Sequence, residues 1–189
     1  MESALIVSYP EKSTAFFTEM LSAASINQIV ALKSCGEARR LLLTRNFDLV
    51  IINSPLKDES GEELSRTLAS DGDTQVILVV PKEKFDSVSA LCETDGVLTI
   101  AKPINKTIFW AALKIARATY SKLVRMHNEN SKLKQKIDDI RIIDRAKWIL
   151  ISYMNMSEKA AHRYIEKQAM DMRLSKRVIA EGILKTYEN

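Results

Sequence analysis

Five short apolar runs, each followed by a stretch with helical periodicity, fill residues 1–105 and leave few folds open to this chain. The runs read "ALIVSY", "QIVAL", "DLVIIN", "QVILVV" and "GVLTIAKP", and they are apolar along most of their length. Strands of this kind belong to parallel sheets, because helices cover both faces of such a sheet. We therefore expect an α/β domain with a doubly wound five-stranded parallel sheet, with helices at residues 12–24, 37–45, 62–69 and 85–92.

The chain changes character after Asn105, since no Pro or Gly occurs between Asn105 and Gly182. A seam with steps of three and four residues then follows: Tyr120, Leu123, His127, Asn130, Leu133, Ile137 and Ile140. This is heptad spacing with one three-residue stammer. We expect a long helix whose residues 113–141 form a coiled coil with a second copy. The alternative is a solvated amphipathic helix that packs only on its own chain.

The dimerisation residues predicted by this seam are Tyr120, Leu123, Ile137 and Ile140.

Residues 142–189 then hold three helical stretches, the first of which continues the long helix to about Met154. Ser157 and Ser175 stand where N-caps of the second and third helices belong. We expect a small three-helix bundle with one modest core, so that the chain divides into residues 1–112, 113–141 and 142–189.

Charge is distributed unevenly along the 189 residues. Residues 1–101 carry 9 Lys and Arg against 15 Asp and Glu, whereas residues 102–189 carry 19 against 9, which gives net charges of −6 and +10. An acidic front and a basic back indicate two modules, and the back half is suited to a polyanionic partner.

Composition excludes several classes of protein. The sequence has 46% hydrophobic and 28% charged residues, as is typical of a globular protein. It contains no apolar run that could span a bilayer and no secretory signal. The sequence therefore predicts a cytoplasmic protein without membrane contact. We expect Cys35 and Cys92 to be reduced and half-buried. Two His and no clustered Cys argue against a zinc site, and we expect neither a metal nor a cofactor.

Residues 4–113 resemble the receiver domain of bacterial response regulators in the order and spacing of their elements. Receivers carry an acidic pair after the first strand, where this chain has Ser8 and Tyr9, and a phospho-accepting Asp after the third strand, where it has Asn53. Gly61 and the Lys102-Pro103 pair match the family pattern. Pro55 lies two residues earlier than the usual proline, and Val80 replaces a Ser or Thr.

The resemblance implies a degenerate phosphorylation site made of Ser8, Tyr9, Asn53, Val80 and Lys102. Phosphoryl transfer to a receiver needs a carboxylate nucleophile and Mg²⁺ bound by carboxylates, and none of these positions supplies one. We therefore expect a pseudo-receiver that is not phosphorylated. Modification elsewhere, or a small ligand in the vacated pocket, remains open. Lys102 is expected either as the solvated end of a strand or bonded to the amide oxygen of Asn53.

Residues 142–184 resemble the ANTAR domain, the RNA-binding module of the AmiR and NasR transcription antitermination regulators. The motif pieces are "RAKWIL" at 145–150, "MSEKAAH" at 156–162, "QAMDM" at 168–172 and "RLSKRVIAEGIL" at 173–184, and the intervals between them agree without gaps. Trp148 replaces the usual Gly and is expected to fill core volume. His162 replaces the usual aromatic residue and is expected as a partly buried ring.

An RNA hairpin presents phosphates and unstacked loop bases, which cations and planar groups recognise. The candidate RNA-binding residues are Arg145, Lys147, Lys159, Arg163, Tyr164, Lys167, Arg173, Lys176 and Arg177. For each Lys or Arg the alternative is a solvated face, and for Tyr164 it is a place in the core.

Together these features predict an RNA-binding antitermination regulator rather than an enzyme. The expected partners are an RNA hairpin in a nascent transcript, a second copy of the chain and a signalling protein at the receiver domain. A DNA-binding response regulator and a non-catalytic interaction scaffold are the alternatives.

Overall fold

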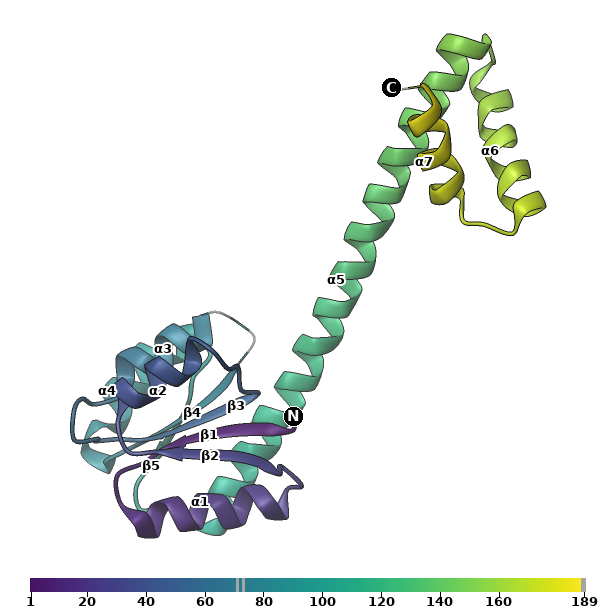
Figure 1. The fold of residues 1–189 in the computed structure, drawn as a ribbon. Coiled ribbons are helices and arrows are strands. Elements are labelled where there is room, and N and C mark those ends of the chain that lie inside the picture. The colour runs from purple at the N-terminus through teal and green to yellow at the C-terminus, as the bar shows by residue number, and fades with distance from the viewer. Residues whose placement is uncertain (71, 73, 188–189) are drawn as a thin grey trace. The chain divides into compact units, whose positions relative to one another are not determined.

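The computed structural model describes residues 1–70, 72 and 74–187. The chain divides into two compact units, Met1–Arg125 and Met126–Asn189, and each is described here by itself. Figure 1 shows an α/β sheet domain in the first unit and a helical bundle in the second. Across the described residues, no helix is both long enough and apolar enough to cross a membrane.

A five-stranded parallel sheet forms the centre of the first unit. Its strands are β1 (Ser3–Val7), β2 (Gln28–Leu32), β3 (Leu49–Asn53), β4 (Gln75–Val80) and β5 (Leu98–Ala101), in the order β2-β1-β3-β4-β5. In the register, Ala4 is opposite both Ile29 and Leu49, and Leu49 is opposite Gln75. Strand order reverses on either side of β1, as in a doubly wound sheet. The predicted fold class is confirmed.

Helices cover both faces of this sheet, as Figure 1 shows. They are α1 (Glu11–Ala23), α2 (Cys35–Leu42), α3 (Glu62–Ser70), α4 (Phe85–Cys92) and the first turns of α5 (Lys106–Met154), with short 3₁₀ turns at Lys82–Lys84 and Glu93–Asp95. On one face, Phe17 of α1 and Phe109 of α5 pack on Ile6 and Ile51. The side chains of α2, α3 and α4 cover the other face.

Alternate residues of each strand serve these two cores, which explains the uninterrupted apolar runs. Ile51 faces the α1 and α5 side, whereas Val50 and Ile52 face the α2, α3 and α4 side. The second core also holds Cys35 and Cys92, which are free thiols with no exposed surface. The expectation that these thiols are half-buried was therefore wrong.

The second unit is a three-helix bundle made by the later turns of α5, by α6 (Glu158–Met172) and by α7 (Lys176–Tyr187). Both predicted caps are confirmed, because Ser157 Oγ accepts the Ala160 amide at 3.2 Å and Ser175 Oγ accepts the Val178 amide at 3.3 Å. A small core holds the bundle together: Ala146, Leu150, Ala161, Ile165, Ala169, Ile179 and Ala180.

Trp148 does not belong to this core. Its neighbours Ala146, Ile149 and Leu150 are buried, but Trp148 itself is 68% exposed. Successive helix positions are 100° apart, so Trp148 faces away from the stripe formed by Ala146 and Leu150. The prediction that it fills core volume was wrong for this geometric reason. Val178 of α7 is also exposed.

Candidate functional site

The carboxyl end of β3 brings two of the predicted receiver-site residues together. Asn53 is 1% exposed, and its Nδ2 donates a hydrogen bond to Ser8 Oγ, at the end of β1, at 3.0 Å. The other amide atom, Oδ1, has no hydrogen-bond partner among the described residues. An uncharged amide–hydroxyl pair therefore stands where receivers place carboxylates.

Lys102 lies after β5 and reaches the same edge of the sheet. Its Nζ donates to the backbone oxygen of Ser54 at 2.5 Å, and burial lowers the pKa of this amine below its ordinary value. The expectation that Lys102 bonds the amide oxygen of Asn53 was wrong, as was the expectation of a solvated strand end. The Ser54 carbonyl, one residue further along the chain, is the acceptor that it reaches.

The remaining two positions of the predicted degenerate site, Val80 and Tyr9, contribute no charge of their own. Val80 is fully buried at the end of β4. Tyr9 is exposed, and the Lys57 ammonium lies 4.0 Å from the centre of its ring. Neither residue can accept a phosphoryl group at a carboxylate or bind a divalent cation. In the part of the chain that the structure describes, no cluster of His, Cys, Asp and Glu could hold a metal ion.

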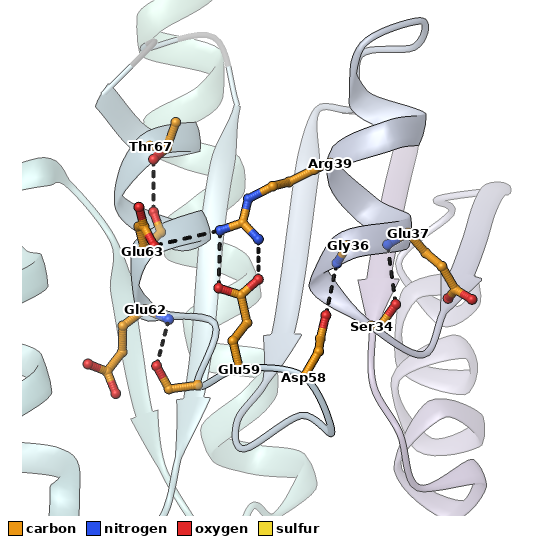
Figure 2. Close-up of polar contacts among 10 residues, drawn as sticks. Ser34, Gly36, Glu37, Arg39, Asp58, Glu59, Glu62, Glu63 and Thr67 are labelled. Atoms are coloured by element: carbon orange, nitrogen blue, oxygen red, sulfur yellow. Dashed lines mark hydrogen bonds and ion pairs between the residues drawn. The ribbon is translucent and has the colours of Figure 1, made fainter.

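The loop from β3 to α3 is tied down by acidic residues, as Figure 2 shows. Asp58 Oδ2 accepts the Gly36 amide at the start of α2 at 2.9 Å. Glu59 forms a two-point ion pair with Arg39 of α2, and Arg39 also approaches Glu63 of α3 at 3.9 Å. The sequence analysis did not predict this network. The acidic residues Asp58 and Glu59 after Pro55 were the one feature of the sequence that could have indicated it.

Two further effects come from this loop. Burial, assisted by the neighbouring Glu59, raises the pKa of the Cys35 thiol to about 12. Gly61 has φ +83° and lies so close to the sheet that an added Cβ would come within 2.5 Å of Ile52 Cγ2. Only glycine combines that backbone conformation with that approach, which explains why the loop after β3 turns at this residue.

The predicted RNA-binding cations fall into two groups in the second unit. Lys159, Arg163 and Lys167 lie four residues apart on α6, are all exposed, and form no ion pair within the described chain. Side chains at this spacing share one face of a helix. We call this set the α6 cation stripe. Arg173, at the left-handed end of α6, is likewise exposed and has no ion pair with a described residue.

The second group of cations bonds to acids of the bundle itself. Lys147 of α5 lies 2.8 Å from Asp144 and 3.5 Å from Glu158 of α6, and its side chain is only 16% exposed. Its hydrogen bond to Asp144 raises the pKa of this amine. This lysine therefore joins α5 to α6.

Two cations of α7 make the corresponding links. Lys176 pairs with Glu166 of α6 at 2.5 Å, and this hydrogen bond lowers the pKa of Glu166. Arg177 pairs with Asp139 of α5 at 2.8 Å and with Glu181 at 2.9 Å. Together with Lys147, these residues link each pair of helices in the bundle, so their charges are already partly neutralised.

The two remaining RNA-binding candidates, Tyr164 and Arg145, lie at the surface of the second unit, as does His162. Tyr164 is exposed on α6 beside Arg163, so its ring is accessible, and Arg145 is an exposed residue of α5. His162 is more exposed than the expected partly buried ring, and its Nε2 lies 3.3 Å from Glu166.

The residues of the predicted dimer seam differ in their surroundings. Leu123, Ile137 and Ile140 have exposed fractions of 36%, 50% and 58%. Tyr120, in contrast, donates a hydrogen bond to Asp48 Oδ1 at 2.8 Å. The apolar part of the seam is accessible, and its first residue joins α5 to the sheet domain.

Known proteins resemble this chain in both of its units. The ANTAR domain family matches residues 131–184. The transcriptional regulatory protein PdtaR of Mycobacterium tuberculosis H37Rv is 23% identical over 150 residues, which cover 79% of this chain and 73% of PdtaR.

Solved receiver domains share the fold of the first unit. A two-component transcriptional regulator AraC from Clostridium phytofermentans ISDg aligns with a TM-score of 0.57 and 18% identity, over 65% of this chain and 98% of that one. The beryllofluoride-activated NtrC4 receiver domain gives a TM-score of 0.55 and 16% identity, over 65% and 99% of the two chains.

The first unit therefore has the fold of a response-regulator receiver domain. Residues 131–184 match the ANTAR domain family, so the chain combines a receiver-like fold with an ANTAR domain.

Proposed function

We propose that this chain is an RNA-binding transcription antitermination regulator whose receiver domain acts without phosphorylation. The observation that carries the proposal is the α6 cation stripe, because Lys159, Arg163 and Lys167 are exposed and form no ion pair with a described residue, inside the segment that matches the ANTAR family. Three cations on one helix face can contact successive phosphates of a folded RNA.

The mechanism is stabilisation of an RNA hairpin that competes with a transcription terminator. Phosphate contacts by the stripe give affinity, and the exposed ring of Tyr164 offers a surface on which an unpaired base can stack. The proposed mechanism requires no covalent chemistry. Because the proposed target is a nascent transcript, the proposal implies that the protein acts in the cytoplasm.

A division of labour follows for the three segments of the chain. Residues 1–112 form the pseudo-receiver and receive a signal, residues 113–141 pair with a second copy, and residues 142–189 bind RNA, although the last two of these residues lie outside the described part. Two RNA-binding modules in one dimer raise the effective concentration of the second module once the first has bound. A signalling protein that contacts the receiver domain is the proposed substitute for phosphorylation.

The test is a salt titration of the affinity for an RNA hairpin with an unpaired loop. Replacing Lys159 or Arg163 with Ala removes one phosphate contact, so each variant should bind more weakly and should lower the salt slope by about one unit. Lys147→Ala is the matched control, because Lys147 already pairs with Asp144 and Glu158. Its slope should change less than that of the stripe variants.

Duplex DNA of the same sequence separates the alternatives. The proposal expects the hairpin to be bound more tightly than the duplex at every salt concentration. Equal binding to both would support a DNA-binding regulator, and no binding to either would support an interaction scaffold. A slope that falls equally for Lys147→Ala and Arg163→Ala would contradict the role of the α6 cation stripe.

A further inference from the structure

A cavity opens at the carboxyl ends of β3 and β5 in the first unit, where the degenerate receiver site lies. Its volume is about 430 Å³, which is enough for a small organic molecule. The polar residues that line it are Lys12, Ser13, Asn53 and Lys102, and Phe16 and Ile104 belong to its apolar wall.

Asn53 contributes an unusual group to this cavity. Its Nδ2 is used by Ser8, whereas Oδ1 is buried and has no donor among the described residues. A buried acceptor without a donor costs free energy, and in this cavity the nearby ammonium of Lys102 bonds to Ser54 instead. Asn53 is one of the residues that line the cavity, so a small rotation of its side chain would let a molecule in the cavity supply the missing hydrogen bond.

The charges around the cavity restrict that molecule further. Lys12 and Lys102 are both cationic, and the lining contains no acid. An anionic group is therefore favoured and an ammonium group is disfavoured. A simple anion does not suffice, because an oxygen without a proton cannot donate to Asn53 Oδ1.

We propose that this cavity binds a small hydroxy acid, whose carboxylate pairs with Lys102 and Lys12 and whose hydroxyl donates to Asn53 Oδ1. Lys102 has three donor hydrogens, so it can keep its bond to Ser54 while it contacts the carboxylate. Phe16 and Ile104 provide an apolar surface for the carbon skeleton. The proposal concerns the sheet domain alone and is independent of RNA binding by the second unit.

The experiment compares three molecules of one shape in titrations of the full-length chain followed by nitrogen-15 NMR. Lactate carries the hydroxyl, propionate lacks it, and alanine replaces it with an ammonium group. Lactate should shift the side-chain amide resonances of Asn53 and should bind at least about tenfold more tightly than propionate, which leaves Oδ1 without a donor. Alanine should bind more weakly than lactate.

Two variants separate the proposed contacts. Asn53→Leu removes the acceptor at similar size, so lactate and propionate should then bind equally. Lys102→Gln should weaken both acids about equally and leave their ratio unchanged, and it tests the site even if Asn53→Leu does not fold. The proposal is overturned if the wild-type chain binds the three molecules equally or if none of them moves the Asn53 resonances. Either result leaves the hairpin titration, and hence the RNA proposal, unaffected.

Discussion

An amide at position 53 keeps the shape of a carboxylate and removes its charge. Asn53 occupies the end of β3, it is 1% exposed, and its side-chain amide donates a hydrogen bond to the neutral Ser8. Burying two or three carboxylates side by side raises their pKa values and is tolerated when a metal ion offsets the repulsion. With Ser8 and Asn53 there is no such repulsion, so the edge of the sheet is stable without a metal.

Exposure of the full-length chain to acetyl phosphate and Mg²⁺ should leave its mass unchanged. The amide of Asn53 is a poor nucleophile, and neither Ser8 nor Tyr9 offers a carboxylate to the cation. Intact-mass spectrometry provides the measurement, with an aspartate-containing receiver treated in parallel as the positive control. A gain of one phosphate that hydroxylamine removes would show that the domain is phosphorylated after all.

Asp48 joins three parts of the first unit. It accepts hydrogen bonds from the backbone amides of Glu2, at 2.5 Å, and Ser3, at 3.0 Å, and from the Tyr120 hydroxyl. Burial alone would raise the pKa of this carboxyl group, but these hydrogen bonds outweigh burial and lower it. A carboxyl group with a lowered pKa in the folded state stabilises that state above its unfolded pKa, and this contribution disappears as the pH falls through the folded pKa.

Asp48→Asn should therefore lower the free energy of unfolding of the first unit at pH 7 by about 1 kcal/mol. The difference between the variant and the wild type should shrink as the pH falls below about 4. Urea unfolding can be followed by Trp110 fluorescence in a Trp148→Phe background. Glu83→Gln, an exposed acid without a hydrogen bond to a described residue, is the control, and an equal loss for that variant would argue against a specific role for Asp48.

At the scale of elements, the sequence predicted most boundaries because apolar periodicity reports burial directly. The strands Gln28–Leu32 and Gln75–Val80 and the helix Phe85–Cys92 have the predicted ends. Helix α2 begins two residues earlier than expected, since Ser34 Oγ caps it through the Glu37 amide.

The candidate sites were less predictable, because they depend on contacts between elements. The Arg39–Glu59 pair joins residues 20 positions apart, and the Arg177–Asp139 pair joins residues 38 positions apart. No local pattern in the sequence indicates which acid a given cation will meet. The sequence could therefore supply the list of basic residues in the bundle, but not the division between the α6 cation stripe and the cations that link the helices.

The exposed seam of α5 leads to a prediction about assembly. Ile137 and Ile140 have about half of their surface exposed in the single chain, and burying such side chains against a second copy is favourable. Replacing both with Asp should convert the proposed dimer into monomers in sedimentation velocity. Met170→Asp introduces one such charge at an exposed apolar residue of α6 and should not change the oligomeric state. A dimer that survives the double replacement would place the interface elsewhere.

At the scale of the whole molecule, the chain has two units with separate cores. The helix α5 belongs to both, because Phe109, Leu113 and Ala116 pack in the sheet domain whereas Ala146 and Leu150 pack in the bundle. The predicted cut at residue 112 would remove Leu113 and Ala116 from the first core, as well as the Tyr120 contact to Asp48.

Two overlapping fragments should therefore separate the activities of the units. Residues 1–125 keep the first core and should not bind the RNA hairpin, whereas residues 113–189 keep the proposed dimer seam and the α6 cation stripe and should bind it with a salt slope close to that of the full chain. Far-ultraviolet circular dichroism checks that each fragment is folded, and electrophoretic mobility shifts measure binding. Hairpin binding by the fragment 1–125 would contradict the proposed division of labour.

The two buried thiols make it possible to measure the opening of the first unit separately from that of the second. A thiol reacts with alkylating reagents as the thiolate and only when the reagent can reach it, and both Cys35 and Cys92 lie within the core beneath α2, α3 and α4. Every cysteine of the sequence is in the first unit. The rate at which iodoacetamide labels the native protein therefore measures how often that sheet domain opens, while unfolding of the helical bundle leaves the labelling rate unchanged.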